Sequence, residues 1–379
     1  MKKKVAVLGA TGSIGTCTLD LIRNCKDHNG NARFEPVLFS ARKNAEALEL
    51  LKKEFPNVMT VLGKEELLKA ISIAGAEITV NGISGAAGLE PSIAAIMAGS
   101  DLALANKETI VLAGHIILGL AEEKNVRIIP VDSEHSALFK LIHSLGKTEV
   151  SELILTASGG PFRNYSMEAL SQVTAEQALS HPTWNMGPKI TIDSATLANK
   201  GLEVIEAAFL FGFPPEKIKV TIHPQSIVHS MVRLKNGAVY AQMSQPDMRL
   251  PIHDALFWPE CESSAYGSLD FDSLFLSFEK PDLEKFPMLK LAYKVLQGPS
   301  GLPVVYNAAN EIAVEAFLQK KIGFLEIPRL VSYVVDNCLP GQDYCTIEGI
   351  LALDEKSRKI TGELINCCSN GDGEFNADL

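Results

Sequence analysis

Three evenly spaced glycines follow the first apolar segment of the chain and constrain its fold more than any other feature. Val5–Leu8 is typical of a short buried strand, Gly9–Gly15 reads Gly-Ala-Thr-Gly-Ser-Ile-Gly, and a helical pattern runs over 14–24. Glycines at such a turn let the backbone approach a pyrophosphate, and the helix N-terminus supplies N–H donors. The spacing is a variant of the dinucleotide fingerprint. An incidental turn is the alternative, but the position directly after a first strand favours dinucleotide binding.

Short β-rich segments alternate with longer helical patterns over the first 131 residues. We expect strands at 5–8, 34–39, 58–62, 78–80, 102–104 and 126–131, and helices at 14–24, 45–55, 90–98 and 107–124. Strands separated by helices are typical of βαβ units and a mostly parallel sheet. The sequence therefore predicts an α/β fold that begins with a Rossmann-like, doubly wound parallel sheet.

The pattern changes from about residue 149. Short strands are expected at 153–156, 189–193, 219–223, 227–233 and 238–243, with a hairpin turn at Asn236-Gly237 between the last two. Helices are expected at 289–297, 307–319, 326–337 and 347–367. We therefore predict a dinucleotide-binding domain at 1–131, a central α+β catalytic domain at 132–257, a linker at 258–287, a C-terminal helical domain at 288–370 and a flexible tail at 371–379.

Composition excludes several classes of protein. The formal net charge of −10 argues against a general nucleic-acid-binding protein, which needs a basic surface. No apolar stretch reaches the roughly 18 residues of a membrane span, and Met1–Lys4 is followed by a strand and a glycine turn rather than by the apolar segment of a secretory leader. The 7 cysteines are odd in number and form no Cys-x-x-Cys pair, which disfavours a zinc ribbon or a disulfide framework. We expect a cytoplasmic protein with reduced thiols.

The segment after the second expected strand bears on cofactor choice. NAD-preferring sites usually carry an acidic residue there, which binds the ribose 2′-hydroxyl. Here the segment reads Ser40-Ala41-Arg42-Lys43-Asn44, with two cations and no carboxylate. Arg42 and Lys43 would attract a 2′-phosphate. The sequence favours NADPH, with a solvated pair of loop charges as the alternative.

Two acidic residues follow the strand expected at 126–131. In extended chain, residues two apart point to the same side, so Asp132 and Glu134 can converge on one cation. Such an all-oxygen site suits Mg²⁺ or Mn²⁺ rather than Zn²⁺. The alternative is that these acids cap the next helix.

Polar residues also gather at 194–203 in an otherwise apolar segment. We expect Ser194 to be a helix N-cap, with Asn199, Lys200 and Glu203 on one helical face. Burying a lysine and a glutamate is unfavourable unless each is paired. A serine, an amide and a lysine together suggest a phosphate monoester site, with Glu203 as a third metal ligand. A structural Lys200–Glu203 ion pair is the alternative.

Three further loops have the composition of a binding site. Ser158-Gly159-Gly160 follows an apolar strand and could present a hydroxyl and backbone donors to a phosphate. The segment 181–187 places Trp184 between proline and glycine, as in a lid that closes over substrate. Ala105–Glu108 follows another expected strand, at the sheet edge where α/β proteins bind ligands. For His223 and His229 we favour buried core histidines over zinc ligands, because no third ligand completes a zinc set.

These motifs together resemble the 1-deoxy-D-xylulose 5-phosphate reductoisomerase family, and they occur in the family's order. The motifs are Gly9–Gly15, Leu104–Glu108, Pro130–Ala137, Leu155–Arg163, His181–Gly187, Ile192–Glu203, His223–Val232 and Gln245–Arg249. The resemblance covers essentially the whole chain. It implies an N-terminal NADPH-binding domain, a central catalytic domain that also dimerises, a C-terminal helical bundle and a homodimer.

The resemblance also implies a role for each matching residue. NADPH would contact Thr11, Gly12, Ser13, Ile14, Lys43, Asn44, Asn106, Glu108 and Gly187, to which Arg42 is added because of its charge. Substrate would contact Lys107, Ser133, Glu134, Ser158, His181, Ser194, Asn199, Lys200 and Glu203. The divalent metal would be bound by Asp132, Glu134 and Glu203, which with Lys107 would be the catalytic residues, and Trp184 and Met186 would belong to the lid. Many family members have glycine where Arg42 stands, which leaves its contact geometry open.

The reaction implied by the resemblance converts 1-deoxy-D-xylulose 5-phosphate to 2-C-methyl-D-erythritol 4-phosphate, in non-mevalonate isoprenoid synthesis. A metal ion, Mn²⁺, Mg²⁺ or Co²⁺, assists a retro-aldol and aldol rearrangement, and NADPH reduces the resulting aldehyde. Another NADPH-dependent enzyme, of the semialdehyde or homoserine dehydrogenase kind, would explain only the first domain. A non-catalytic NADPH-binding protein would need neither the carboxylates nor the tryptophan loop.

Overall fold

The computed structural model describes residues 2–184, 186–338 and 344–369. The chain divides into two compact units. Unit 1 comprises Met1–Ile110, Ile117–Gly146 and Gln242–Ser273, and unit 2 comprises Val111–Ile116, Lys147–Ala241 and Leu274–Leu379. The functional domain boundaries expected above stay a prediction, and the expected tail at 371–379 lies outside the described residues.

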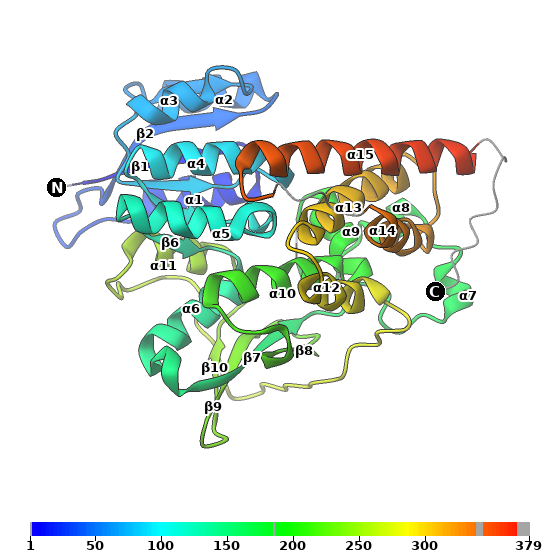
Figure 1. The fold of residues 1–379 in the computed structure, drawn as a ribbon. Coiled ribbons are helices and arrows are strands. Elements are labelled where there is room, and N and C mark those ends of the chain that lie inside the picture. The colour runs from blue at the N-terminus through cyan, green and yellow to red at the C-terminus, as the bar shows by residue number, and fades with distance from the viewer. Residues whose placement is uncertain (1, 185, 339–343, 370–379) are drawn as a thin grey trace. The chain divides into compact units, whose positions relative to one another are not determined.

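Unit 1 is built on a parallel sheet. Its described strands are β1 (Lys3–Leu8), β2 (Phe34–Ala41), β3 (Met59–Leu62), β4 (Ile78–Asn81), β5 (Asp101–Leu104) and β6 (Ile128–Pro130), in the order β3-β2-β1-β4-β5-β6. Neighbouring strands pair in parallel. The crossover helices are α1 (Ser13–Asn24), α2 (Ala45–Glu54), α3 (Leu67–Ile73), α4 (Leu89–Met97) and α5 (Lys107–Lys124), and Figure 1 shows α2 and α3 beside β2. The expected doubly wound α/β fold is confirmed.

The core of unit 1 includes a helix from much later in the chain. Val5 and Val7 of β1 are fully buried. Ile252 and Leu256 of α11 (Arg249–Phe257) belong to the same apolar cluster. We did not expect α11, because its proline and its short length obscure the helical pattern in the sequence.

Helix α3 was also missed, and helix α6 (Ser133–Leu145), directly after β6, was considered only as the next helix that the acidic pair would cap. For α6 the local signals were present: Asp132 is its N-cap and Gly146 its C-cap. An acidic or amide residue before a helix and a glycine after it are the usual end signals.

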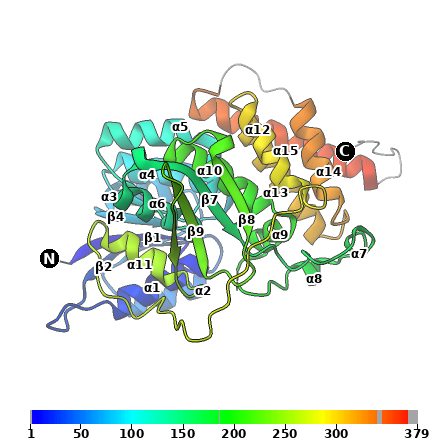
Figure 2. The ribbon, with the colours of Figure 1, turned by 90° about the horizontal axis from the view of Figure 1, so that it is seen from below.

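Unit 2 contains a mixed sheet. Its strands are β7 (Val150–Ala157), β8 (Ile218–Ile222), β9 (Val228–Leu234) and β10 (Val239–Met243), in the order β10-β9-β7-β8. β8 runs parallel to β7, and β9 runs antiparallel to it. The expected turn at Asn236-Gly237 joins β9 and β10, with Gly237 at a φ of +89°. Helix α10 (Ala198–Phe211) packs on β7 and β8 (Figure 2).

One expected strand of unit 2 is wrong. Residues 189–193 lie in helix α9 (Pro188–Thr196), with Gly187 as the N-cap and a proline in the first turn. Pro at the first helical position is favourable, because its fixed φ suits a helix and its missing N–H is not needed there. The β-branched residues 190–192 suggested a strand, but packing outweighed this weak preference. Two short helices, α7 (Met167–Leu170) and α8 (Ala175–Ala178), precede α9.

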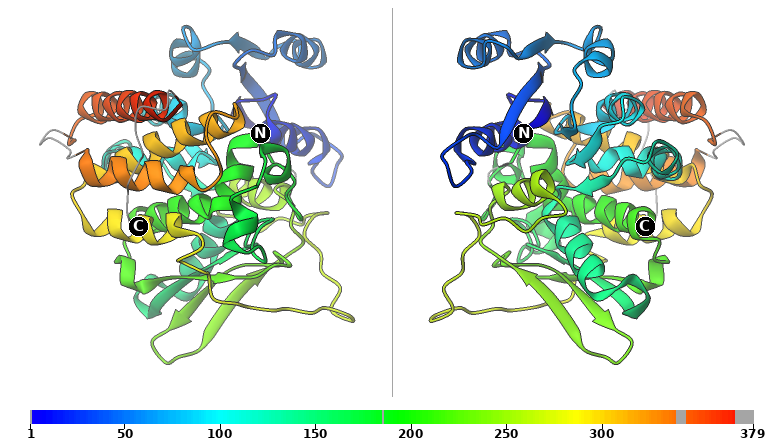
Figure 3. Two further views of the ribbon diagram at one scale, coloured as in Figure 1. Left: turned by 90° about the vertical axis from the view of Figure 1, so that its right-hand side faces the viewer. Right: turned by 90° about the vertical axis from the view of Figure 1, so that its left-hand side faces the viewer.

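The last part of unit 2 is a layer of helices, as expected. It consists of α12 (Pro287–Gln297), α13 (Leu302–Leu318), α14 (Glu326–Asn337) and α15 (Ile347–Ser369). Figure 3 shows these helices grouped together, coloured from yellow to red. Helix α13 is buried along most of its length and packs on both α14 and α15.

Within the described residues, no helix is long and apolar enough to cross a membrane. The cysteines with described side chains, at 17, 25, 261, 338, 345 and 367, are free thiols.

Candidate active site

The glycine loop after β1 has the backbone geometry that a dinucleotide needs. Gly9 has a φ of +79°, which favours glycine, and a Cβ at Gly15 would lie 2.3 Å from the Gly9 carbonyl oxygen. Gly12 is the N-cap of α1, and the nearest atom to a Cβ there would be 3.4 Å away. The first glycine thus makes the turn, the second leaves space beside the helix N-terminus, and the third allows close packing. The loop fits the pyrophosphate of a dinucleotide.

A second loop of unit 1 lies beside the glycine loop, and sequence reasoning missed it. β1 and β4 are neighbours at the point where the strand order reverses, which is where doubly wound sheets bind ligands. The loop after β4 begins with Gly82, whose carbonyl oxygen would lie 3.1 Å from a Cβ at Gly9. The side chain of Asn81 accepts from the Ile83 N–H (3.0 Å) and donates to the Gly88 carbonyl (2.9 Å). The signal in the sequence was the glycine-rich segment 82–88 after an expected strand.

The end of β2 presents the expected cations. The Ser40 carbonyl accepts from the Ala10 N–H (2.8 Å), which ties this strand end to the glycine loop. Arg42 and Lys43 follow and are exposed. Asn44 is the N-cap of α2, and its Oδ1 accepts from the Ala47 N–H at 3.1 Å. Two exposed cations and no carboxylate suit a 2′-phosphate.

Asn106, at the end of the β5 loop, has a buried carboxamide. It is 2% exposed, donates to the Gly85 carbonyl (2.9 Å) and to Glu108 (3.0 Å), and accepts from the Thr109 N–H (2.9 Å) as N-cap of α5. A Cβ at Gly88 would lie 2.6 Å from the Asn106 Cγ, so a glycine is needed at that position. The side chain of Asn106 therefore orients Glu108 and the β4 loop.

Asp132 lies at the centre of a polar cluster in unit 1. The Lys107 Nζ donates to its Oδ2 at 2.5 Å. Its Oδ1 caps α6 by accepting from the Glu134 N–H (3.2 Å) and lies 3.3 Å from the His135 Nδ1. The Ser133 hydroxyl donates to the Glu134 carboxylate at 2.7 Å.

This geometry corrects the reasoning that predicted the acidic pair. Glu134 lies in the first turn of α6, so the two acids are not alternate residues of an extended chain. Asp132 does cap the helix, which was the alternative considered, yet it also pairs with the buried ammonium of Lys107. His135 is fully buried against Asp132 and was not predicted. Among the described residues, Asp132 and His135 belong to a group that could hold a metal ion, and Glu134 does not.

In unit 2, His181 connects two of the predicted loops. The Nδ1 of His181 accepts from the N–H groups of Thr183 (3.1 Å) and Trp184 (3.0 Å). Because Nδ1 is an acceptor, Nε2 carries the proton and donates to the Ser158 hydroxyl oxygen at 3.0 Å. Burial lowers the pKa of His181 below its usual value, which favours this neutral form. The Trp184 ring lies near the His229 ring, with centroids 6.3 Å apart.

The junction between α9 and α10 places the residues expected at the substrate phosphate. Ser194 lies inside α9 rather than at an N-cap, and Leu197 joins the two helices with a φ of +60°. A Cβ at Gly160 would lie 2.8 Å from the Ser194 carbonyl oxygen, so the β7 loop packs directly on this helix. The β7 loop, which also carries Ser158, and the end of α9 are therefore adjacent.

The expected helical face on α10 is confirmed. Glu203 is 1% exposed, and its carboxylate accepts from the Lys200 Nζ and from the Asn199 Nδ2, each at 2.5 Å. Lys200 is 4% exposed. The structural Lys200–Glu203 ion pair, which was the alternative considered above, is therefore present. Removing one partner of such a buried pair lowers the free energy of unfolding by about 3–5 kcal/mol.

His223 is a core histidine, as favoured from the sequence. Its Nδ1 lies 2.9 Å from the Ser277 carbonyl oxygen, its Nε2 accepts from the Ile227 N–H at 3.2 Å, and its ring stacks on Phe278. Of the His, Cys, Asp and Glu groups in the described part of the chain that could hold a metal, none includes His223 or His229.

The predicted site residues thus form two groups, and each is described within its own unit. In unit 1 they are Thr11, Gly12, Ser13, Ile14, Arg42, Lys43, Asn44, Asn106, Lys107, Glu108, Asp132, Ser133 and Glu134. In unit 2 they are Ser158, His181, Trp184, Met186, Gly187, Ser194, Asn199, Lys200 and Glu203.

Comparison with known proteins places these groups in one family. Residues 5–56 and 29–114 match 1-deoxy-D-xylulose 5-phosphate reductoisomerase, residues 128–211 match its C-terminal domain, and residues 243–360 match the DXP reductoisomerase C-terminal domain. The reductoisomerase of Lachnospira eligens is 46% identical over 383 residues, covering 96% of this chain and 99% of the relative. That of Chlorobium phaeobacteroides is 46% identical over 387 residues, covering 96% of this chain and 100% of the relative.

Solved structures agree with the sequence relatives. A DOX-P reductoisomerase in complex with NADPH, fosmidomycin and magnesium has a TM-score of 0.90 at 36% identity, covering 97% of this chain and 99% of that chain. The Zymomonas mobilis 1-deoxy-D-xylulose 5-phosphate reductoisomerase in complex with NADPH has a TM-score of 0.87 at 40% identity, covering 96% and 99%. The chain therefore belongs to the 1-deoxy-D-xylulose 5-phosphate reductoisomerase family.

Proposed function

We propose that this chain is an NADPH-dependent, metal-requiring enzyme that converts 1-deoxy-D-xylulose 5-phosphate to 2-C-methyl-D-erythritol 4-phosphate. One observation of the structure carries the proposal beyond family membership. The same parallel sheet that bears the dinucleotide loop also bears the Lys107–Asp132 pair, 2.5 Å apart, directly after β5 and β6. The groups proposed for cofactor and substrate therefore follow strands of one sheet, at the edge where doubly wound enzymes bind ligands.

NADPH would be held by the loops at these strand ends. The three glycines of 9–15 and the N-terminus of α1 suit its pyrophosphate, and Arg42 and Lys43 suit its 2′-phosphate. When bound, NADPH supplies a hydride and the divalent metal supplies a Lewis acid for oxygen atoms of the substrate.

The metal would be held by Asp132, Glu134 and Glu203, following the family's pattern. Their donor atoms are all carboxylate oxygens, which suits Mg²⁺, Mn²⁺ or Co²⁺ better than a soft ion. Asp132 and Glu203 already bear hydrogen bonds from Lys107 and Lys200 respectively. These hydrogen bonds orient each carboxylate, which is what a ligand requires.

The protein's own groups would bind the rest of the substrate and exclude water. Ser158, Ser194, Asn199 and Lys200 supply hydroxyl, amide and ammonium donors for the phosphate monoester. The Lys107 Nζ lies beside Asp132, from which it can donate to a substrate oxygen. The His181–Trp184 segment would close over the carbon chain, since Trp184 is only partly buried.

We also infer that the chain forms a homodimer through β10. This strand is at the edge of the unit 2 sheet, and Val239 and Tyr240 on it are 45% and 46% exposed. Phe275 and Phe278 are 72% and 46% exposed. An exposed apolar edge strand is a template for pairing with another chain. Sedimentation equilibrium should give about twice the chain mass, and Tyr240→Lys should shift it toward the monomer. The cytoplasmic location stays a prediction.

The proposed activity is tested by following the decrease in NADPH absorbance as the cofactor is oxidised. We expect loss of absorbance only when 1-deoxy-D-xylulose 5-phosphate, NADPH and a divalent metal are all present. Asp132→Asn and Glu203→Gln should each abolish turnover and leave the dissociation constant for NADPH nearly unchanged. Turnover with an amino acid semialdehyde instead would favour the dehydrogenase alternative, and NADPH binding without any turnover would favour a non-catalytic protein.

A further inference from the structure

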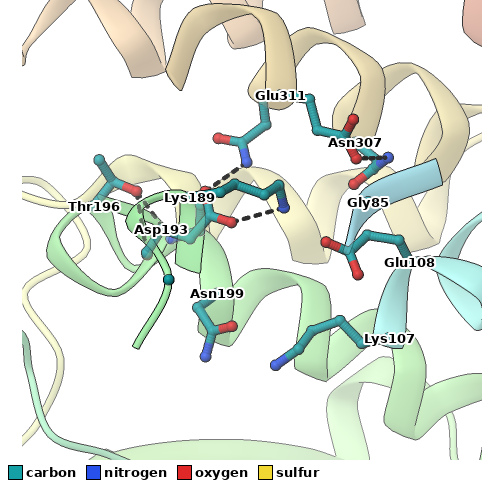
Figure 4. Close-up of polar contacts among 12 residues, drawn as sticks. Gly85, Lys107, Glu108, Lys189, Asp193, Thr196, Asn199, Asn307 and Glu311 are labelled. Atoms are coloured by element: carbon teal, nitrogen blue, oxygen red, sulfur yellow. Dashed lines mark hydrogen bonds and ion pairs between the residues drawn. The ribbon is translucent and has the colours of Figure 1, made fainter. Parts of the chain in front are cut away.

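Helix α13 holds a buried carboxylate of α9. The Asn310 Nδ2 of α13 donates to the Asp193 Oδ1 at 2.7 Å, and the two residues are 0% and 1% exposed. Lys189, one turn earlier on α9, donates to the other oxygen of Asp193 at 2.8 Å. Figure 4 shows the Lys189 ammonium directed at this carboxylate. A donor 117 residues away in sequence therefore fixes the orientation of the residue directly before Ser194.

The same helix also contacts α10. Tyr306 of α13 is fully buried, and its hydroxyl donates to the Met288 carbonyl at 3.2 Å. A Cβ at Gly201 would lie only 2.6 Å from that hydroxyl oxygen. Gly201 directly follows Lys200, so Tyr306 packs on the turn of α10 that carries the expected phosphate ligands. Helix α13 therefore contacts α9 at Asp193 and α10 at Gly201, on either side of the junction between these two helices.

Between these two contacts lies a disfavoured backbone conformation. Leu197 joins α9 to α10 with φ +60° and ψ +13°, in the left-handed region. Leucine has no local hydrogen-bonding compensation there, and a bulky residue at positive φ is an outlier. Such a conformation persists when the surrounding structure holds it in place. The angle at Leu197 sets the direction of Asn199 and Lys200 relative to Ser194.

We infer that Asn310 and Tyr306 are positioning residues for the end of the substrate that bears the phosphate. They hold α9 and α10 on either side of Leu197, so that Ser194, Asn199 and Lys200 converge on one group. This inference rests on the proposed function, because it names the phosphate as the group that is positioned. The C-terminal helical layer then has a role in substrate recognition, although Asn310 and Tyr306 are not themselves proposed to touch the substrate.

The main test compares two asparagines of the same helix. Asn310→Ala removes the donor to Asp193, whereas Asn307→Ala removes an equally buried amide whose Nδ2 bonds Glu311 within α13, at 3.1 Å. We expect Asn310→Ala to raise the KM for 1-deoxy-D-xylulose 5-phosphate about tenfold, which corresponds to about 1.4 kcal/mol. The dissociation constant for NADPH should not change. Asn307→Ala should leave both constants near those of the wild type.

A charge swap separates positioning from general destabilisation. In Asp193→Asn with Asn310→Asp the amide and carboxylate exchange places, so one hydrogen bond between α9 and α13 is retained. This double variant should recover most of the lost affinity for substrate, while either single variant does not. An unchanged KM in Asn310→Ala, or equal increases in Asn310→Ala and Asn307→Ala, would overturn the inference. Absence of wild-type turnover would instead refute the proposed function.

A second pair of variants covers the case in which Asn310→Ala fails to fold. Gly201→Ala should raise the KM for the sugar phosphate because the new methyl group displaces Tyr306 or α10, although alanine suits a helix better than glycine. Adding Tyr306→Phe removes the hydroxyl that the methyl group meets and should restore a KM near the wild-type value. A wild-type KM in Gly201→Ala alone, or no recovery in the double variant, would contradict a positioning role for Tyr306.

Discussion

His181 is expected to order the tryptophan loop and Ser158 by different ring nitrogens, and the two roles can be separated. Its Nδ1 accepts from the N–H groups of Thr183 and Trp184, and its Nε2 donates to Ser158. Asparagine places an oxygen near the position of Nδ1, so His181→Asn keeps the two backbone contacts and loses the contact with Ser158. Glutamine reaches the position of Nε2, so His181→Gln keeps the Ser158 contact and loses the two in the loop.

The size of each effect follows from the number of bonds lost. A hydrogen bond contributes about 0.5–1.5 kcal/mol net, so two lost bonds in His181→Gln correspond to about 1–3 kcal/mol. Converted to affinity, this is about a 5- to 150-fold weaker binding of a phosphonate substrate analogue. His181→Asn loses one bond and should weaken binding by about tenfold at most.

The assay is fluorescence titration of Trp184 with the analogue in the presence of metal and NADPH. Trp258 is the other tryptophan of the chain, so Trp258→Phe gives a background with one indole, and Trp184→Phe should remove the signal. We expect His181→Gln to bind more weakly than His181→Asn. The reverse order, or equal binding by the two variants, would refute the assignment of the loop contacts to Nδ1.

Three other predictions concern the pH dependence of His181, the glycine loop after β1 and the cations after β2. Burial lowers the pKa of His181, so its contribution to loop order should be fully present above about pH 6.5 and be lost as the pH falls through that lowered pKa. The KM for substrate should therefore rise at acid pH, and this rise should be smaller in His181→Asn. Gly15→Ala should lower the melting temperature and abolish NADPH binding, since its Cβ would lie 2.3 Å from the Gly9 carbonyl oxygen; Gly12→Ala, with 3.4 Å of space, should weaken NADPH binding at an unchanged melting temperature. Arg42→Ala with Lys43→Ala should weaken NADPH binding by about 1–3 kcal/mol and leave NADH binding unchanged; equal losses for both cofactors would show that these cations do not contact the 2′-phosphate.

Local sequence was sufficient wherever an element is stabilised by its own residues. Helix α5 has the expected bounds, Lys107–Lys124, because Asn106 caps its start and Asn125, at φ +52°, ends it. The glycine loop was predictable for a similar reason, since its three glycines lie within seven positions of one another and directly follow the first strand. The family motifs also identified the polar residues of both units without any knowledge of their contacts.

Local signals were misleading where packing decides between alternatives. Residues 189–193 are β-branched enough to suggest a strand, yet they form part of α9 because Pro188 starts a helix and α13 covers it. Asp132 and Glu134 stay predicted site residues, but the local reasoning that singled them out was wrong. Asp132 is the N-cap of α6 and Glu134 lies in its first turn, so the two residues are not on one side of an extended strand.

Tertiary structure alone decided how the site residues are held. The bond between Asp193 and Asn310 joins residues 117 positions apart, and the contact of Tyr306 with Gly201 joins a helix of the C-terminal layer to α10. No periodicity or capping rule relates such residues, because the chain between them is free to place them anywhere until the core has formed. The sequence by itself determined which chemical groups this protein has and which elements carry them. The packing of α13 on α9 and α10 determined how these two helices are held, since a buried carboxylate and a left-handed leucine are stable only where distant side chains hold them.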